Sequence, residues 1–119
     1  MSQHETTTPV KLPNAERMKK IRVKYRQALL SVGKSPDYHI FDISPEFLDN
    51  LKDSKAKRFL TNLRHYFLNL KEEDQRFFVM EILEVGRHYP FWYLDVYTRR
   101  QYEKRLQTIV SEVPTCLER

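Results

Sequence analysis

Histidine, cysteine and clustered acidic residues are the side chains that could carry out catalysis or hold a metal ion, and in this sequence they are few and scattered. The histidines stand far apart, at His4, His39, His65 and His88, and no pair has the spacing of a zinc site. The single cysteine, Cys116, cannot form an internal disulfide. The sequence also has no glycine-rich phosphate loop and no nucleophile elbow. We therefore expect no enzyme, no metal or cofactor site and no small-molecule substrate.

One acidic run, Glu72-Glu73-Asp74, could in principle hold a cation. The same three residues precede a segment with helical periodicity, and negative charge in the first turn of a helix complements the helix dipole. The start of a helix is the better explanation of this run.

Basic residues are concentrated in two parts of the chain. Residues 1–33 contain seven Lys or Arg against two Glu, a net charge of +5, and residues 98–119 contain five against three, a net +2. Residues 71–97, between them, contain three against six, a net −3. This uneven distribution is compatible with an anionic partner.

The elements that must position these charges are predicted to be helices. The chain has 119 residues, enough for one domain, and it has only two glycines, which disfavours a β-domain with many tight turns. Apolar residues at helical spacing and capping residues predict helices over about 14–32, from Ser44-Pro45 to about 51, and over 55–70, 72–85, 90–96 and 99–113. The expected fold is therefore all-α, a single compact bundle of about five to six helices.

The segments outside these helices are predicted to be a loop and two tails. Residues 33–44 form the loop, anchored to the core by Tyr38, Ile40, Phe41 and Ile43. Residues 1–13 form a flexible N-terminal tail, residues 14–113 the helical domain and residues 114–119 a C-terminal tail.

The last third of the chain has the layout of a helix-turn-helix: a long helix, a short one, a brief turn and a basic helix. On a helical wheel of 99–113, the apolar residues gather on one side, and Arg100, Lys104, Gln107, Thr108 and Ser111 lie opposite. Arg and Lys suit guanine edges and phosphates, and Gln suits adenine. Two features differ from the usual motif, because the turn lacks glycine and the short helix is rich in aromatic residues. An ordinary solvated helix face is the alternative explanation.

The segment from Leu70 to Val113 resembles the region-4 helix-turn-helix of sigma factors and, more narrowly, the small phage-encoded transcriptional regulators of the ArpU type. The resemblance lies in YTRRQYEKRLQTIV (97–110), where a hydroxyl cap is followed by basic residues, a tyrosine and more basic residues. It implies sequence-directed binding of double-stranded DNA by a transcriptional regulator. The residues expected near the DNA are Arg99, Arg100, Gln101, Lys104, Arg105 and Thr108.

The helix over 14–32 has a basic surface that could add phosphate contacts if it lies on the same side of the molecule. Its candidates are Lys19, Lys20, Arg22, Lys24 and Arg26, with Arg17 on the same helix. The same charges could bind an acidic protein or an anionic membrane surface, or simply form a charged helix exterior.

Three consecutive aromatic residues, Phe91, Trp92 and Tyr93, support a second hypothesis. They cannot all face the same side of a helix, so at least one is expected at the surface. An exposed aromatic patch there would mark contact with a protein partner or a second copy of the chain, as in a helical adaptor or inhibitor.

The first residues, MSQHETTTPV, are polar and show no signal peptide. The longest apolar runs, such as Phe77-Phe78-Val79-Met80, fall far short of the roughly 20 residues that a membrane span requires. We therefore expect a cytoplasmic protein without a membrane partner.

Overall fold

The computed structural model describes residues 14–84 and 91–117, which contain helices and no strand. The α-helices are α1 (Asn14–Ser31), α2 (Pro45–Asp49), α3 (Ser54–Leu68), α4 (Glu72–Phe78) and α5 (Arg99–Glu112). Three 3₁₀ turns, η1 (Ile40–Asp42), η3 (Trp92–Asp95) and η4 (Thr115–Leu117), and one π-helical turn, η2 (Val79–Leu83), complete them. The all-α prediction is confirmed. The predicted tail over 1–13 and the start of the short helix at Pro90 lie outside the described residues.

Local capping chemistry explains where several helices begin and end. The side chain of Ser44 accepts a hydrogen bond from the backbone N–H of Phe47 at 3.1 Å, and Pro45 is the first residue of α2. Asp53 caps α3 in the same way. At the end of α1, Gly33 adopts a φ of 80°, which L side chains rarely tolerate. The helix start predicted at Ser44-Pro45 is confirmed.

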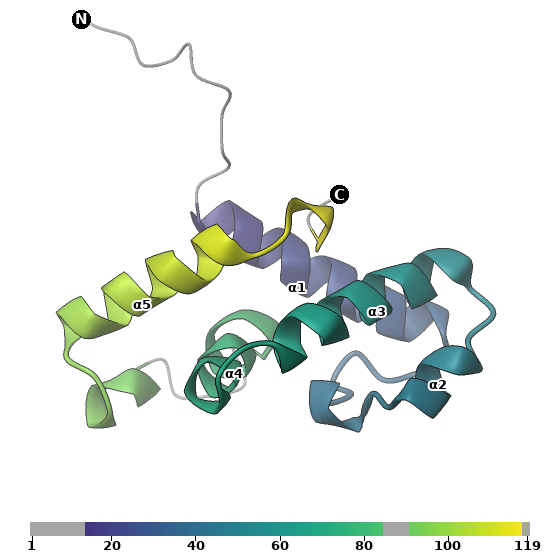
Figure 1. The fold of residues 1–119 in the computed structure, drawn as a ribbon, viewed down its shortest axis with the longest axis horizontal. Helices are drawn as coiled ribbons and strands as arrows, with labels where there is room; N and C mark the ends of the chain where they lie inside the picture. Colours follow the sequence, from purple (N-terminus) through teal and green to yellow (C-terminus); the bar gives the residue numbers. More distant parts are fainter. Residues whose placement is uncertain (1–13, 85–90, 118–119) are drawn as a thin grey trace, which may run out of the picture.

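The helices cross in a bundle in which α1 and α3 form the centre (Figure 1). α1 packs against α3, against the π-helical turn and against α5. α2 lies at one end of the long axis, and the N-terminal end of α5 lies at the other, beside η3 (Figure 1). The chain thus places the predicted recognition helix at an extremity of the molecule.

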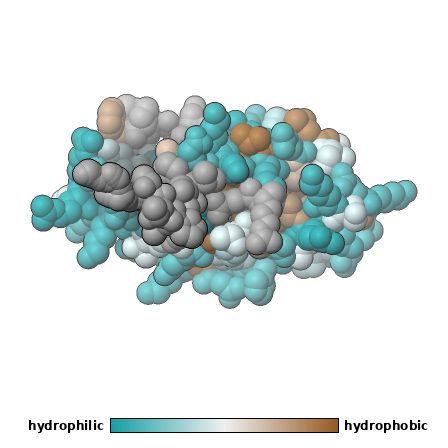
Figure 2. All heavy atoms as spheres, turned by 90° about the horizontal axis from the view of Figure 1, so that it is seen from above, coloured by the Kyte–Doolittle hydropathy of each residue, from teal (hydrophilic) through white to brown (hydrophobic). Residues whose placement is uncertain are grey.

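One continuous apolar core joins these elements. Its largest fully buried side chains come from every long helix and from the last turn: Tyr25, Ile21 and Leu29 of α1, Leu60, Leu63 and Phe67 of α3, Phe77 and Phe78 of α4, Ile82 of η2, Val110 of α5 and Leu117 of η4. By contrast, the face seen from above is mostly hydrophilic, with a few apolar residues at the surface (Figure 2).

The helix predicted over 72–85 differs from the structure in its second half. α4 ends at Phe78 and continues as a π-helical turn, closed by a hydrogen bond from the N–H of Glu84 to the carbonyl of Val79 at 2.8 Å. A π turn adds one residue to the helical repeat and so changes which side chains share a face. Here Ile82 and Leu83 are buried, while Glu81 reaches the aromatic residues of η3 and α5.

Two smaller predictions need correction. Phe41 was expected to anchor the loop, and its ring does meet that of the buried Phe67, with centroids 5.2 Å apart. Phe41 is nevertheless 59% exposed, because in η1 the residues Ile40 and Ile43, three apart, share the inward side. Residues 114–119 were expected to be a tail, but Leu117 is fully buried, so the chain stays packed on the bundle as far as η4.

Candidate nucleic-acid interface

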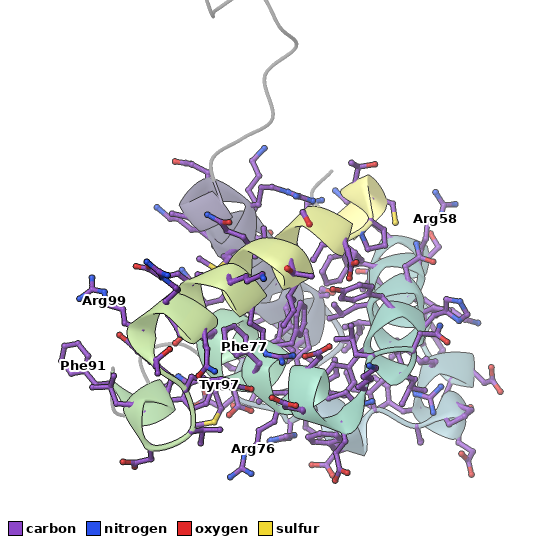
Figure 3. The ribbon with its side chains drawn as sticks, turned by 60° about the vertical axis from the view of Figure 1, so that its left-hand side comes forward. Arg58, Arg76, Phe77, Phe91, Tyr97 and Arg99 are labelled. Carbon is purple, nitrogen blue, oxygen red and sulfur yellow. The ribbon has the colours of Figure 1, made fainter. Side chains whose placement is uncertain are left out.

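The outward side of α5 consists of polar and basic residues. Arg99, Arg100, Gln101, Lys104, Gln107, Thr108 and Ser111 are all exposed. Arg99 points away from the body of the molecule at the projecting end of the helix (Figure 3). The inward side carries Ile109, Val110 and Val113, which are buried, and Tyr102 and Leu106, which pack against the core. The amphipathic division predicted for this helix is therefore present.

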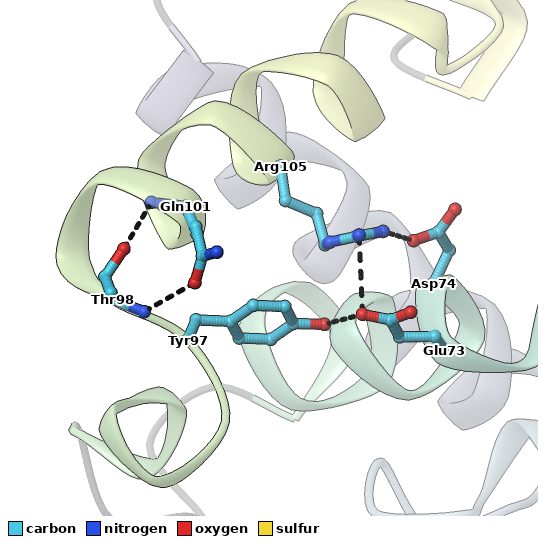
Figure 4. A network of polar contacts seen from close by, with 6 residues as sticks. All are labelled: Glu73, Asp74, Tyr97, Thr98, Gln101 and Arg105. Carbon is cyan, nitrogen blue, oxygen red and sulfur yellow. Dashed lines mark hydrogen bonds and ion pairs between the residues drawn. The ribbon is translucent and has the colours of Figure 1, made fainter.

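A capping box fixes the N-terminus of α5. The Thr98 hydroxyl accepts a hydrogen bond from the N–H of Gln101 at 3.1 Å, and the Gln101 side-chain oxygen accepts one from the N–H of Thr98 at 2.9 Å (Figure 4). This confirms the cap predicted from the sequence. It also engages the side-chain oxygen of Gln101 with the backbone of Thr98, so base recognition by this side chain would rely on its NH₂ group.

Arg105 was predicted to contact DNA, but its guanidinium faces α4. It donates a hydrogen bond to Asp74 and lies 3.4 Å from a carboxylate oxygen of Glu73 (Figure 4). The Tyr97 hydroxyl donates to the same Glu73 carboxylate at 2.6 Å. Burial, and then this hydrogen bond, raise the pKa of Tyr97 to about 12. Arg105 thus joins α5 to α4. Its charge is already paired with the carboxylates of Glu73 and Asp74, so it is not available for a phosphate.

Some of the remaining polar residues of α5 have partners within the helix, and others have no ion pair. Arg99 pairs with Glu103 at 3.5 Å, both exposed, which is a weak interaction at a solvated surface. The Thr108 hydroxyl donates to the carbonyl of Lys104 within the helix. Arg100 and Lys104, one turn apart, have no ion pair with any residue in the described part of the chain.

The basic residues of α1 do not form one surface. Lys19 and Lys20 are exposed, whereas Arg22, Lys24 and Arg26 are half-buried. Arg22 turns toward the π-helical turn, where it donates to the carbonyl of Ile82 at 3.5 Å, and burial lowers its pKa. Lys24 instead lines a groove shared with α3. Arg22 and Lys24 therefore face different parts of the molecule, so these two of the five predicted phosphate contacts do not share one surface.

Arg17 requires a clear correction, because it is 5% exposed rather than part of a basic surface. Its guanidinium donates to the carbonyl of Val110 at 2.6 Å and to that of Val113 at 3.0 Å. Carbonyls in the last turn of a helix lack the usual partner four residues on, and a cation there also complements the helix dipole. The Val110 carbonyl also accepts a hydrogen bond from the N–H of Val113 at 3.3 Å. Arg17 therefore caps the C-terminal end of α5.

Only one of the three consecutive aromatic residues is largely exposed. Phe91 is 49% exposed, whereas Tyr93 is 7% exposed and stacks on Tyr102 with ring centroids 3.8 Å apart. Trp92 packs against the core and donates to Glu81 at 2.8 Å. The same Glu81 carboxylate accepts a hydrogen bond from Tyr102 at 2.7 Å, and burial together with that bond raises the pKa of Tyr102.

Two exposed apolar residues beside Phe91 were missed by the sequence reasoning. Leu94 is 56% exposed and Val96 is 65% exposed. Both follow the three consecutive aromatic residues. Their positions do not fit one apolar helix face, and that misfit is the signal that could have identified them as exposed. Phe91, Leu94 and Val96 form what we call the η3 patch, since all three lie in or next to η3.

Among the described residues, no helix combines the length and apolar character needed to cross a bilayer, and no three His, Cys, Asp or Glu side chains gather as a metal site. Comparison of the chain with protein-family models, curated proteins and solved structures gives no match.

Proposed function

We propose that this protein binds double-stranded DNA, with the N-terminal half of α5 leading into the major groove. The observation that carries the proposal is the pair Arg100 and Lys104, which are exposed and lack ion-pair partners among the described residues. Their helix begins at an extremity of the molecule (Figure 1). A recognition helix presents its N-terminal residues to the base edges, so this placement suits the task.

The way in which α5 is held also supports this role. The capping box, the contact of Arg105 with Asp74 and the guanidinium of Arg17 restrain the helix along its length. A helix that is already oriented loses less conformational entropy on binding. The resemblance to sigma region 4 and to the ArpU-type regulators adds the finer proposal that binding is sequence-directed and regulates transcription.

The deciding experiment is a titration of labelled random-sequence duplex DNA at about 50 and 200 mM salt. If four phosphates are contacted, the affinity should fall on the order of a hundredfold across that range. The variant Arg100→Gln/Lys104→Gln should bind more weakly and reduce the slope of log K against log salt by about 2.

The matched control is Lys71→Gln/Arg76→Gln, which removes the same charge from exposed positions. Arg76 lies on α4 and points away from the bundle (Figure 3). If this control weakens binding as much as the α5 variant does, the attraction depends on net charge alone and the α5 interface is wrong. Absence of binding at about 50 mM salt would reject DNA as the partner.

The η3 patch favours a second candidate function, contact with another protein. Phe91, Leu94 and Val96 are each about half exposed or more, and they lie next to the start of α5. A surface of this kind is typical of the apolar centre of a protein interface. Sedimentation of the chain over a wide concentration range tests self-association, which Leu94→Ser should abolish if the patch pairs with a second copy.

A further inference from the structure

A groove separate from α5 runs between α1 and α3, and one residue of η4 also lines it. It encloses about 470 Å³ and is lined by residues from all three elements. α1 contributes Lys24 and Gln27, α3 contributes Lys55, Arg58 and Asn62, and η4 contributes Cys116. Arg58 and Arg99 lie on opposite sides of the molecule in Figure 3, so this groove is remote from the projecting end of α5.

The groove has an excess of positive charge. Three cations, Lys24, Lys55 and Arg58, face a single carboxylate, Asp53. That carboxylate already accepts hydrogen bonds from the N–H groups of Lys55 and Ala56, both at 3.1 Å. None of the three cations forms an ion pair with another residue in the described ranges.

The cations also act on one another. Burial lowers the pKa of Lys24, and the nearby ammonium groups of Lys55 and Lys20 lower it further. Like charges held this close repel each other, and an anion placed among them removes that repulsion.

The rest of the lining suits a small organic anion rather than a bare ion. Ala28, Ala56 and Phe59 provide an apolar floor, and the short alanine side chains leave room above it. The amides of Gln27 and Asn62 supply both donors and acceptors beside the cations. A concave site with an apolar floor and a few polar groups is the usual form of a small-molecule site, and its volume is within the usual range of roughly 300–1,000 Å³.

We propose that this groove binds a small phosphate-bearing ligand of about nucleotide size. Its phosphoryl groups lie among Lys24, Lys55 and Arg58, and its less polar part lies on the floor formed by Ala28, Ala56 and Phe59. The proposal goes beyond DNA binding by α5, uses a different surface and involves no reaction. The sequence predicts no small-molecule substrate, and the ligand proposed here is bound without being converted.

Cys116 provides the readout, because it is the only cysteine of the chain, is exposed and lines the groove. The experiment measures the rate at which the full chain reacts with the uncharged reagent 4,4′-dithiodipyridine. Sodium tripolyphosphate, ADP and adenosine are added separately at matched ionic strength. Tripolyphosphate and ADP should slow the reaction at least threefold in a saturable way, and adenosine should have little effect.

Two double variants locate the effect. Lys24→Gln/Arg58→Gln should lose the protection of Cys116 by tripolyphosphate and ADP, whereas Lys71→Gln/Arg76→Gln should keep it. Thermal unfolding of each variant verifies that it is folded, and in the unmodified chain ADP should raise the midpoint of unfolding.

The proposal is overturned if tripolyphosphate and ADP leave the reaction rate of Cys116 unchanged. It is also overturned if both double variants remain equally protected, or if duplex DNA protects Cys116 and tripolyphosphate does not. Its failure is distinguishable from failure of the DNA proposal, because Arg100→Gln/Lys104→Gln should weaken DNA binding without altering the protection by ADP.

Discussion

α1 and α3 pack through side chains excluded from water, whereas the N-terminal half of α5 combines the packing of the Tyr102 ring on Phe77 of α4 with ion pairs and hydrogen bonds to α4 and η2. At the centre, Ile21 and Leu29 of α1 and Leu60 and Leu63 of α3 are all 0% exposed. At the projecting end, the connections run from Arg105 to Asp74 and from Tyr102 to Glu81, and these groups remain partly accessible to water.

These two kinds of contact contribute differently to the stability of the bundle and to the orientation of α5. Burial of apolar surface is the main favourable term in folding, but it has little directional preference. Hydrogen bonds and ion pairs contribute less net free energy, yet they have strict geometry. We infer that the centre supplies most of the free energy of unfolding, and that the polar contacts fix the direction in which α5 leaves the bundle.

The largest effect should come from truncating a central side chain. Leu60→Ala leaves a cavity in the core and should lower the free energy of unfolding by about 3–5 kcal/mol, measured by urea denaturation. Leu68→Ala is the matched control, since it is the same change on the same helix at a position that is 52% exposed. Equal losses in the two variants would contradict the central role of apolar burial.

The next effect concerns the cap on α5. Arg17→Gln removes two charge-assisted hydrogen bonds and leaves the carbonyls of Val110 and Val113 without these donors. It should lower the free energy of unfolding by about 2–3 kcal/mol.

Lys19→Gln, an equal charge loss at an exposed position of α1, should have an effect within about 0.5 kcal/mol. Hydrogen exchange should quicken in the last turn of α5 of the Arg17 variant. Unchanged exchange there would show that Arg17 does not restrain the helix.

The smallest effect should come from the ion pair between Arg105 and Asp74. Because both side chains keep contact with solvent, a double-mutant cycle with Arg105→Gln and Asp74→Asn should give a coupling of about 1 kcal/mol or less. Loss of this ion pair should nevertheless disturb the orientation of α5. Arg105→Gln should therefore weaken DNA binding more than Arg76→Gln, which removes the same charge elsewhere. A coupling as large as the loss from Leu60→Ala would remove the distinction between the two regions.

The parts of the fold that were predictable depend on neighbours in sequence. Thr98 with Gln101, Asp53 and Ser44 act on residues two or three positions away, so their residue types alone reveal the helix starts. The π-helical turn at Val79–Leu83 was not predictable in this way, since it has no residue signature of its own and its buried side chains pack against α1, which is distant in sequence.

The candidate site was harder to predict because charged residues were assumed to be exposed. Arg17 occupies a position on the apolar stripe of α1, four residues before Ile21 and eight before Tyr25, and that spacing was the available sign that it points inward. The groove between α1 and α3 had no such sign. Lys24 and Lys55 are brought together only by the packing of two helices that are distant in sequence.

The bonds of Arg17 also govern when the protein can finish folding as it is synthesised. The guanidinium and its two carbonyl partners are separated by 93 and 96 positions along the chain. At about 5–20 residues per second, a ribosome needs roughly 5–20 s to make the intervening segment. During that interval Arg17 lies on the core-facing side of α1 while the end of α5 that it caps has not yet been made. Docking of α5 must therefore be among the last steps in assembling the bundle.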